Sequence, residues 1–301
     1  MASMTFRELD LAADAGPFVD LLLATHPWAV TNETEWQHRR SAIPERARLF
    51  TRVAEEDGTI VGAVEARLEF FGSGDIAYLS VRVRPSHQNR GIGSELYDLG
   101  FEHVRSVGAR QVTSLFEESD AAVEFARRRG WREARAETLA LLDPRTVTET
   151  PDPTVDVQPA HELDPRELHR IDEEATRDMP AFEVVEEIPY EDWCNFIWDS
   201  PLFTRDGSFG AVVDGRVASI SFLFADVAIG RGMNMFTGTS REHRGRGLAL
   251  AVKLATTNWA AANGVTQIVT MNDETNAPML AVNRRLGYVP CGRRVEYVKD
   301  L

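Results

Sequence analysis

Apolar and polar residues alternate along several short stretches of the chain. Residues 79–83 read Leu-Ser-Val-Arg-Val, a period of two that is typical of a strand with one buried face. Residues 50–55 and 59–68 flank the pair Asp57-Gly58. This arrangement predicts a two-stranded hairpin closed by an Asp-Gly turn.

A helical period follows the third of these strands. Between Ile92 and Val107, apolar residues recur every three or four positions, which predicts an amphipathic helix. Gly108 suits a left-handed residue at the helix end. A strand over 111–115 and another helix before Gly130 complete the pattern. The predicted order is hairpin, strand, glycine turn, helix, strand, helix, strand.

The same order recurs in the second half of the chain, and the two copies keep a nearly fixed spacing. The paired anchors are Gly91 and Gly247 (247 − 91 = 156), Gly108 and Gly264 (156), and Gly130 and Gly287 (157). A long period shared by several anchors indicates a duplication. A length of 301 residues also fits two domains of roughly 150 residues each.

The seam between the copies is rich in proline. Four prolines interrupt residues 144–159 and no apolar period runs through them, which favours a semi-rigid linker. The sequence therefore predicts an N-terminal domain over residues 1–143, a linker over 144–159, and a C-terminal domain over 160–301.

Composition narrows the class of protein. Hydrophobic residues make up 43% of the chain, enough for two ordinary cores, but no apolar run is long enough to cross a bilayer. Residues 1–14 contain neither a basic head nor an apolar signal core, which favours the cytoplasm. Only Cys194 and Cys291 are present, so neither disulfides nor a cysteine-ligated metal is expected. A net charge of −14 argues against nucleic acid as a partner.

A glycine-rich turn joins the predicted strand and helix in each half. The two turns read Gln88-Asn89-Arg90-Gly91-Ile92-Gly93 and Arg244-Gly245-Arg246-Gly247-Leu248-Ala249. Glycine allows close approach to the backbone, and the N–H groups that begin a helix bind phosphate. Tight turns also need glycine for steric reasons alone, but two copies in the same context favour phosphate binding. Neither turn matches a P-loop or a dinucleotide fingerprint.

These turns, with the residues before them, resemble the acyl-coenzyme A (acyl-CoA) signature Gln/Arg-x-x-Gly-x-Gly/Ala of the GNAT N-acetyltransferases. Residues 276–288 resemble the closing helix and turn of that family. The resemblance implies an α/β fold of two fused GNAT-like domains in tandem, each with a mixed, mostly antiparallel sheet flanked by helices. It implies an acyl-CoA-dependent N-acyltransferase that uses acetyl-CoA as co-substrate and a small primary amine as acceptor, with no membrane partner.

In this family the pantetheine arm lies between two parallel strands that separate, and it pairs with the first of them. A backbone N–H there polarises the thioester carbonyl, and the amine attacks directly. The resemblance assigns cofactor binding in the first domain to Val81, Val83, Gln88, Asn89, Arg90, Gly91, Ile92, Gly93 and Ser94. In the second domain it assigns Thr237, Thr239, Arg244, Gly245, Arg246, Gly247, Leu248 and Ala249.

The family's tyrosine acid has no counterpart here. Its position holds Ala126 in the first copy and Asn283 in the second. A thiol with a pKa of about 8.5 is a tolerable leaving group without an acid. Asn276 retains the family's polar residue on the closing segment, where Ser119 stands in the first copy. This difference favours the second domain as the catalytic one.

Candidates for the general base are carboxylates near the expected cleft. They are Asp226 and Glu274 in the second domain, with Glu69 and Glu117 in the first. A base must lie within hydrogen-bond reach of the amine, directly or through one water, and the alternative for each is a solvated surface charge. The predicted catalytic set is therefore Asn276, Asp226 and Glu274.

The segments expected to shape the acceptor site hold acidic and aromatic residues. An acidic run, which would favour a cationic amine if it rims the cleft and is otherwise an exposed helix face, comprises Glu183, Glu186, Glu187, Glu191 and Asp192. Aromatic and imidazole side chains, expected to pack rather than bind ligand, are His26, Trp28, Trp36, Trp193, Phe196 and Trp198. The alternative function, prompted by the missing tyrosines, is a non-catalytic acyl-CoA sensor or scaffold.

Overall fold

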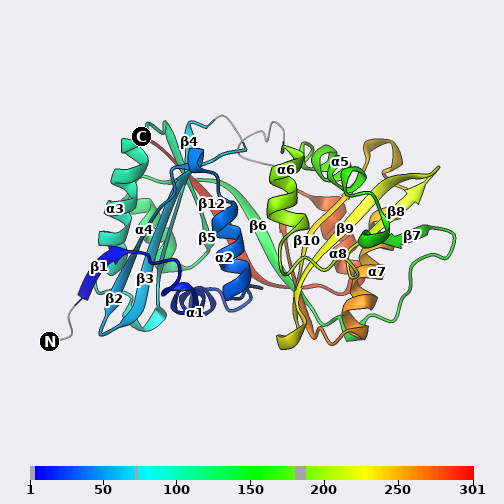
Figure 1. Ribbon diagram of the computed structural model, residues 1–301, viewed down its shortest axis with the longest axis horizontal. Coiled ribbons are helices and arrows are strands. Elements are labelled where there is room, and N and C mark those ends of the chain that lie inside the picture. Colours follow the sequence, from blue (N-terminus) through cyan, green and yellow to red (C-terminus); the bar gives the residue numbers. More distant parts are fainter. Residues whose placement is uncertain (1–3, 72–73, 180–187) are drawn as a thin grey trace. The chain divides into compact units, whose positions relative to one another are not determined.

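The computed structural model describes residues 4–71, 74–179 and 188–301. The chain forms two compact units (Figure 1). Unit 1 contains Met1–Ala136 and Arg294–Leu301, and unit 2 contains Glu137–Arg293. None of the helices in the described residues combines the length and the apolar character that a membrane span requires.

Unit 1 follows the predicted order of elements after an N-terminal strand and two helices. Its elements are β1 (Met4–Glu8), α1 (Ala15–Thr25), α2 (Glu33–Ala42), β2 (Phe50–Glu56), β3 (Thr59–Leu68), β4 (Ile76–Val83), α3 (Ile92–Ser106), β5 (Gln111–Glu117), α4 (Asp120–Arg128) and the start of β6 (Arg132–Leu142). The predicted hairpin is confirmed, and Gly108 has the expected positive φ of 81°.

Unit 2 repeats this order. Its elements are β7 (Asp156–Pro159), α5 (Pro165–Thr176), α6 (Tyr190–Trp193), β8 (Phe209–Val213), β9 (Arg216–Asp226), β10 (Arg231–Thr239), α7 (Leu248–Ala262), β11 (Gln267–Asp273), α8 (Ala277–Leu286) and the start of β12 (Val289–Asp300). A π-helical segment, Cys194–Trp198, follows α6. Short 3-10 turns lie at Glu45–Ala47, Pro85–His87, Pro144–Thr146, Ala160–Glu162, Val227–Ile229 and Arg241–His243.

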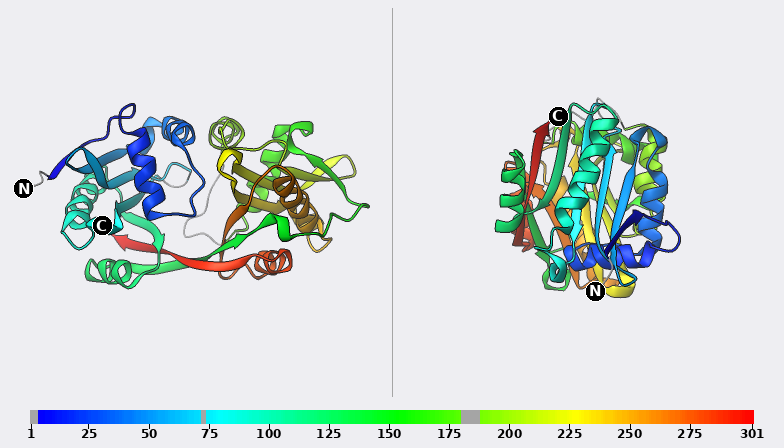
Figure 2. Two further views of the ribbon diagram at one scale, coloured as in Figure 1. Left: turned by 90° about the horizontal axis from the view of Figure 1, so that it is seen from below. Right: turned by 90° about the vertical axis from the view of Figure 1, so that its left-hand side faces the viewer.

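Each unit is a mixed sheet covered by helices on both faces. The strand order is β1-β2-β3-β4-β5-β12 in unit 1 and β7-β8-β9-β10-β11-β6 in unit 2. Within each, most neighbours are antiparallel, but β4 pairs with β5 in parallel, as β10 does with β11. In unit 1, α1 and α2 cover one face and α3 and α4 the other (Figure 2). The two cores of unit 1 therefore lie on opposite faces of one sheet.

The last strand of each unit comes from the other half of the sequence. Strand β12 pairs with β5 from Arg294↔Glu117 to Asp300↔Gln111, and β6 pairs with β11 from Leu142↔Ile268 to Glu137↔Asp273. The compact units therefore differ from the predicted ranges 1–143 and 160–301 at both ends. The sequence pattern identifies β6 and β12 as strands, but alternation does not reveal a strand's partner. Within the predicted linker, Asp156–Pro159 also form a strand, β7, paired with β8.

Candidate functional site

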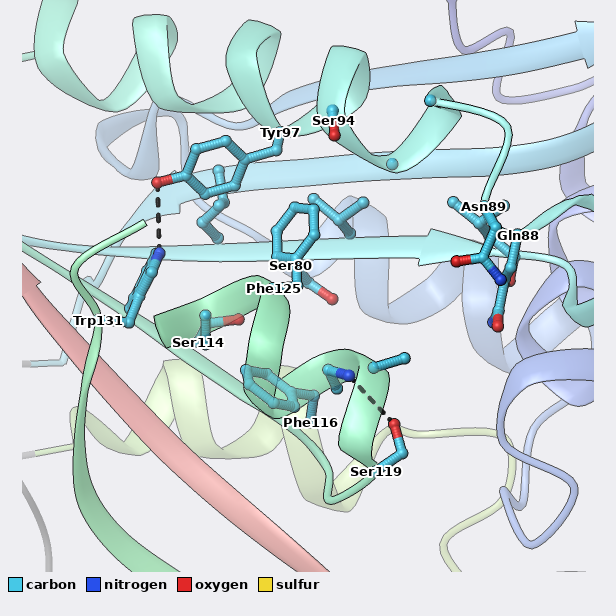
Figure 3. A pocket seen from close by; sticks show the side chains of 18 residues that line it. Ser80, Gln88, Asn89, Ser94, Tyr97, Ser114, Phe116, Ser119, Phe125 and Trp131 are labelled. Atoms are coloured by element: carbon cyan, nitrogen blue, oxygen red, sulfur yellow. Dashed lines mark hydrogen bonds between the residues drawn. The ribbon is translucent and has the colours of Figure 1, made fainter. Parts of the chain in front are cut away.

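The parallel strands β4 and β5 separate midway along their length. They pair at Ile76↔Gln111, Ala77↔Val112 and Tyr78↔Thr113, and β4 continues to Val83 without a partner on this side. A cavity of about 330 Å³ occupies the opening. Its lining contains Leu79, Ser80, Val81, Val83, Gln88, Asn89, Gly91, Gly93, Ser94, Tyr97, Ser114, Phe116, Ser119, Ala121, Ala122, Phe125, Ala126 and Trp131 (Figure 3).

Aromatic side chains form one end of this cavity. Tyr97 and Trp131 lie at one end and Gln88 and Asn89 at the other (Figure 3). Trp131 Nε1 donates a hydrogen bond to the Tyr97 hydroxyl at 3.3 Å, and the Tyr97 and Phe125 rings meet edge to face at 5.6 Å. Burial raises the pKa of Tyr97, so its hydroxyl keeps its proton. The cavity is thus mainly apolar at this end.

The glycine turn lies at the other end of the cavity. Asn89 and Gly91 have φ values of +60° and +86°, which turn successive N–H groups toward one side. Among the described residues, the backbone N–H groups of 89–93 have no acceptor. A Cβ on Gly91 would meet no atom within 4 Å. Five unpaired N–H groups at the start of the 15-residue helix α3 form a site suited to a phosphate anion.

Charged side chains near this turn are already paired. Arg90, expected to meet the phosphates directly, binds Glu56 through Nη1 at 3.0 Å and Nη2 at 2.5 Å. This bond lowers the pKa of Glu56, with a smaller effect from His87 at 3.1 Å. Arg129, which the sequence motifs do not single out, donates to Ser94 Oγ at 2.9 Å and lies 3.6 Å from the centre of the Phe125 ring. The sequence feature that could have indicated Arg129 is the Arg-Gly-Trp turn after α4.

Unit 2 has the same turn. Gly245 and Gly247 have φ values of +76° and +80°, and the N–H groups of residues 245–249 find no acceptor among the described residues. Arg244 binds Asp178 at 2.6 Å and the Thr239 carbonyl at 3.2 Å. Both turns therefore leave backbone N–H groups without an acceptor among the described residues, and phosphate binding stays a prediction.

The cleft behind the second turn differs from that of unit 1. Lys253 holds the position in α7 that Tyr97 holds in α3 (253 − 97 = 156). Its Nζ donates to Asn234 Oδ1 at 2.6 Å and lies 5.0 Å from the centre of the Tyr288 ring. Only 2% of the residue is exposed, and this burial lowers its pKa to about 7.

Further polar contacts join the two strands beside Lys253. The Thr270 hydroxyl of β11 donates to the Asn234 carbonyl of β10 at 3.2 Å, immediately beyond the last paired residues Met233↔Val269. Asn283, at the family's tyrosine position, donates to Asn272 Oδ1 at 2.6 Å. A buried polar network thus lies where unit 1 has cavity-lining side chains.

The structure does not bring the predicted catalytic residues together. Asn276 caps α8 by accepting from the Met279 N–H at 3.3 Å, as Ser119 caps α4. Asp226 is opposite Arg231, at the end of β10 that is still paired with β11 and away from the opening. Glu274 is exposed and binds Arg293 at 2.9 Å. The alternation of β9 and β11 could not show which end of each strand reaches the opening.

The first-unit carboxylates have different neighbours. Glu69 forms an ion pair with Arg67 at 3.0 Å. Glu117 accepts a short hydrogen bond from Trp28 Nε1 and follows Phe116 of the cavity lining. Of the candidate bases, Glu117 is thus next to the opening of unit 1.

Of the aromatic and imidazole residues near the expected acceptor segments, Trp36 and Trp193 are buried, while His26, Trp28, Phe196 and Trp198 are partly exposed. Trp36 lies 4.8 Å from Phe18, and buried Trp193 donates to Asp172 at 2.7 Å. Of the acidic run, Glu183, Glu186 and Glu187 lie outside the described residues, while Glu191 and Asp192 belong to α6.

Comparisons with known proteins agree with this geometry. Residues 17–131 match the model of the acetyltransferase (GNAT) family. No curated protein matches the chain in sequence. The fold is similar to that of a tandem GNAT protein from the clavulanic acid biosynthesis pathway, solved without AcCoA. That protein is 21% identical with a TM-score of 0.76, over 99% of this chain and 98% of its own.

Two further structures extend the comparison. A GCN5-related N-acetyltransferase from Sphaerobacter thermophilus is 19% identical with a TM-score of 0.72, over 99% of this chain and 95% of its own. The glucosamine N-acetyltransferase region of a fungal multi-domain enzyme is 18% identical, with a TM-score of 0.66. The match covers 99% of this chain and 38% of the fungal one. Residues 17–131 thus match the acetyltransferase (GNAT) family model, and the whole chain shares its fold with solved GNAT structures, one of them a tandem GNAT protein.

Proposed function

We propose that the protein is an acyl-CoA-dependent N-acyltransferase that moves an acetyl group from acetyl-CoA to the primary amine of a small molecule. The observation that carries this proposal is the cavity between β4 and β5, which ends at five unpaired backbone N–H groups. The N–H groups suit the diphosphate, and the narrow, mainly apolar cavity suits the pantetheine arm and acetyl group.

We assign acetyl-CoA binding to unit 1. The two turns are alike, so the assignment depends on the space behind them. In unit 1 that space is a cavity lined by Tyr97 and Trp131. In unit 2 the corresponding position in the helix holds Lys253, a buried ammonium group that donates to Asn234 and faces the Tyr288 ring. This contrast favours unit 1 as the unit that binds acetyl-CoA. In the sequence, Asn276 instead favoured the second domain as the catalytic one.

The chemistry needs few protein groups. A neutral amine attacks the thioester carbon, the new N–C bond replaces the C–S bond, and the thiolate leaves, while the excess proton on the nitrogen passes through water to the departing thiolate. The unpaired edge of β4 beyond Tyr78 offers backbone N–H groups to the developing oxyanion. Ala126 supplies no acid, and a thiolate leaving group needs none. Glu117, through a water, is the proposed acceptor of the ammonium proton.

The test is thiol release from acetyl-CoA with a panel of primary amines, combined with calorimetric titration of acetyl-CoA. The proposal expects saturable binding and amine-dependent release of free CoA, with the acetylated amine identified by mass spectrometry. Binding without release for every amine would instead support the acyl-CoA sensor. Absence of binding would contradict both functions.

A further inference from the structure

The face of the unit 1 sheet opposite the cavity carries charged residues on the same strands. Side chains alternate between the two faces of a strand. Val81 and Val83 line the cavity, so Arg82 between them points to the face covered by α1 and α2. Likewise Glu117 follows Phe116 of the cavity lining. Arg82 and Glu117 thus lie on the α1 and α2 face, on the two strands that separate here.

Arg82 is mostly buried on this face, and part of its guanidinium group makes no hydrogen bond within the described residues. Its side chain is 15% exposed, and Nη1 donates to Glu65 at 3.2 Å. Its Nε is buried and has no hydrogen-bond partner among the residues that the structure describes. Leaving a buried charged donor unpaired is costly, so such a group in a folded protein needs an explanation. Nε and Nη2 form one edge of the guanidinium, the edge that binds carboxylate or phosphate in a two-bond fork.

The charges around Arg82 do not balance it. Glu65 is shared with Arg40, whose Nη1 lies 3.2 Å from it and whose Nη2 donates to Thr51 at 2.8 Å. Two guanidinium groups thus share one carboxylate. His26 adds no positive charge near neutral pH, because burial, with smaller effects from Arg82 and Arg294, lowers its pKa to about 4. The ion pairs of Arg82 and Arg40 on this face therefore share the one carboxylate of Glu65.

We propose that the acceptor amine also carries an acidic oxygen group, a carboxylate or a phosphate, which binds the Nε and Nη2 edge of Arg82. This inference rests on the proposed acetyl transfer and narrows its acceptor to amino-acid-like or phosphorylated amines. The acidic group holds the acceptor on the α1 and α2 face, and the amine reaches the opening between β4 and β5. The cationic amine suggested by the acidic run at 183–192 is a poorer match to Arg82.

Binding of reaction products tests the inference without turnover. Calorimetry with excess CoA compares N-acetylated amino acids with the N-acetylated amines that lack only the carboxylate, and N-acetylphosphoethanolamine with N-acetylethanolamine. We expect the acidic member of at least one pair to bind about tenfold or more tightly, the usual strength of hydrogen bonds to charged groups. The carboxylate and phosphate pairs show which group is preferred.

Variants assign the preference to Arg82. Arg82→Gln should abolish it, and Arg82→Lys should keep part of it, since the charge remains without the fork. Arg52→Gln is the matched control, because Arg52 pairs with Glu8 at 2.7 Å outside this cluster. Acetyl-CoA affinity within about twofold of wild type shows that Arg82→Gln is folded. If Arg82→Gln binds acetyl-CoA more weakly than that, the inference is judged from the product pairs measured with wild type and Arg82→Lys. Equal binding within every pair overturns the inference.

The free amines of the same pairs are assayed for thiol release. Release without discrimination between acidic and neutral amines overturns the inference and leaves the proposed function standing. Selective binding of acidic products without any thiol release supports the Arg82 site and contradicts acetyl transfer.

Discussion

The two units share a phosphate-type turn and differ in the cleft behind it. In each turn five backbone N–H groups find no acceptor within the described part of the chain, and the central glycines, Gly91 and Gly247, have nearly the same φ. Two helical turns farther along, Tyr97 lines a cavity, whereas Lys253 is buried against Asn234 and Tyr288. The two units therefore share the glycine turn, and we propose that this one helix position decides whether the arm of the ligand has room.

The comparison also shows what the buried lysine costs unit 2. An ammonium group among apolar side chains is destabilising unless it is paired with a carboxylate. The described partners of Lys253 Nζ are the neutral Asn234 and an aromatic ring. Unit 2 therefore carries a buried lysine at a cost in stability, where unit 1 has the uncharged Tyr97.

The largest expected effect comes from placing a carboxylate in each turn. Gly91→Glu should reduce turnover roughly 100-fold or more, because it sets a negative charge against the phosphates. Gly247→Glu is the matched control, with nearly the same φ and the same strain, and should leave turnover within about twofold. Steady-state thiol release measures both. Equal losses would show that the clefts do not differ in function.

The pH dependence of stability tests the buried lysine. Burial lowers the pKa of Lys253 from 10.5 to about 7. Between these values the unfolded chain binds the proton and the folded chain does not, so stability rises with pH, by up to about 1.4 kcal/mol per pH unit. Below about pH 7 both states are protonated and the full penalty applies.

Lys253→Met removes the charge with little change in volume. The variant should be more stable than wild type at pH 7, and the difference should shrink by pH 9. Urea unfolding of both proteins at pH 7 and pH 9 measures this difference in stability. If the two units unfold separately, the comparison uses the unfolding transition that the substitution shifts. A constant difference would mean that Lys253 is protonated in the folded protein across this range.

Exchanging the distinguishing residue should convert one cleft toward the other. Tyr97→Lys places a charged chain in the unit 1 cavity and should weaken acetyl-CoA binding about tenfold, because a buried ammonium resists desolvation. Tyr97→Phe removes only the hydroxyl bonded to Trp131 and should bind within about twofold of wild type. Calorimetry compares the two variants. Unchanged affinity in Tyr97→Lys would remove the basis for assigning the cofactor to unit 1.

The smallest effect concerns the ion pair at the first turn. Glu56→Gln removes a carboxylate that holds Arg90 and should raise acetyl-CoA affinity about threefold, in keeping with the modest strength of exposed ion pairs. The gain should fade at high salt, because exposed charges are screened. Calorimetry at two salt concentrations measures it. Weaker binding would show that Glu56 orients Arg90 for the phosphates.

The sequence predicted local structure better than long-range partners. Alternation and helical spacing located the hairpins, the strands before the turns and the helices after them, since these features depend on neighbouring residues. The pairing of β12 with β5 joins Asp300 to Gln111, which no local pattern encodes. The buried role of Lys253 was also missed, although a lysine on the apolar face of α7 was visible. Arg82 escaped notice because an alternating strand is expected to carry polar residues on one face.

The number of acetyl-CoA sites tests the central claim most directly. Isothermal titration of the wild-type protein should give one site per chain, unchanged in Gly247→Glu and lost in Gly91→Glu. Two sites per chain, or a single site that survives in Gly91→Glu and disappears in Gly247→Glu, would contradict the assignment of the cofactor to the cleft of unit 1.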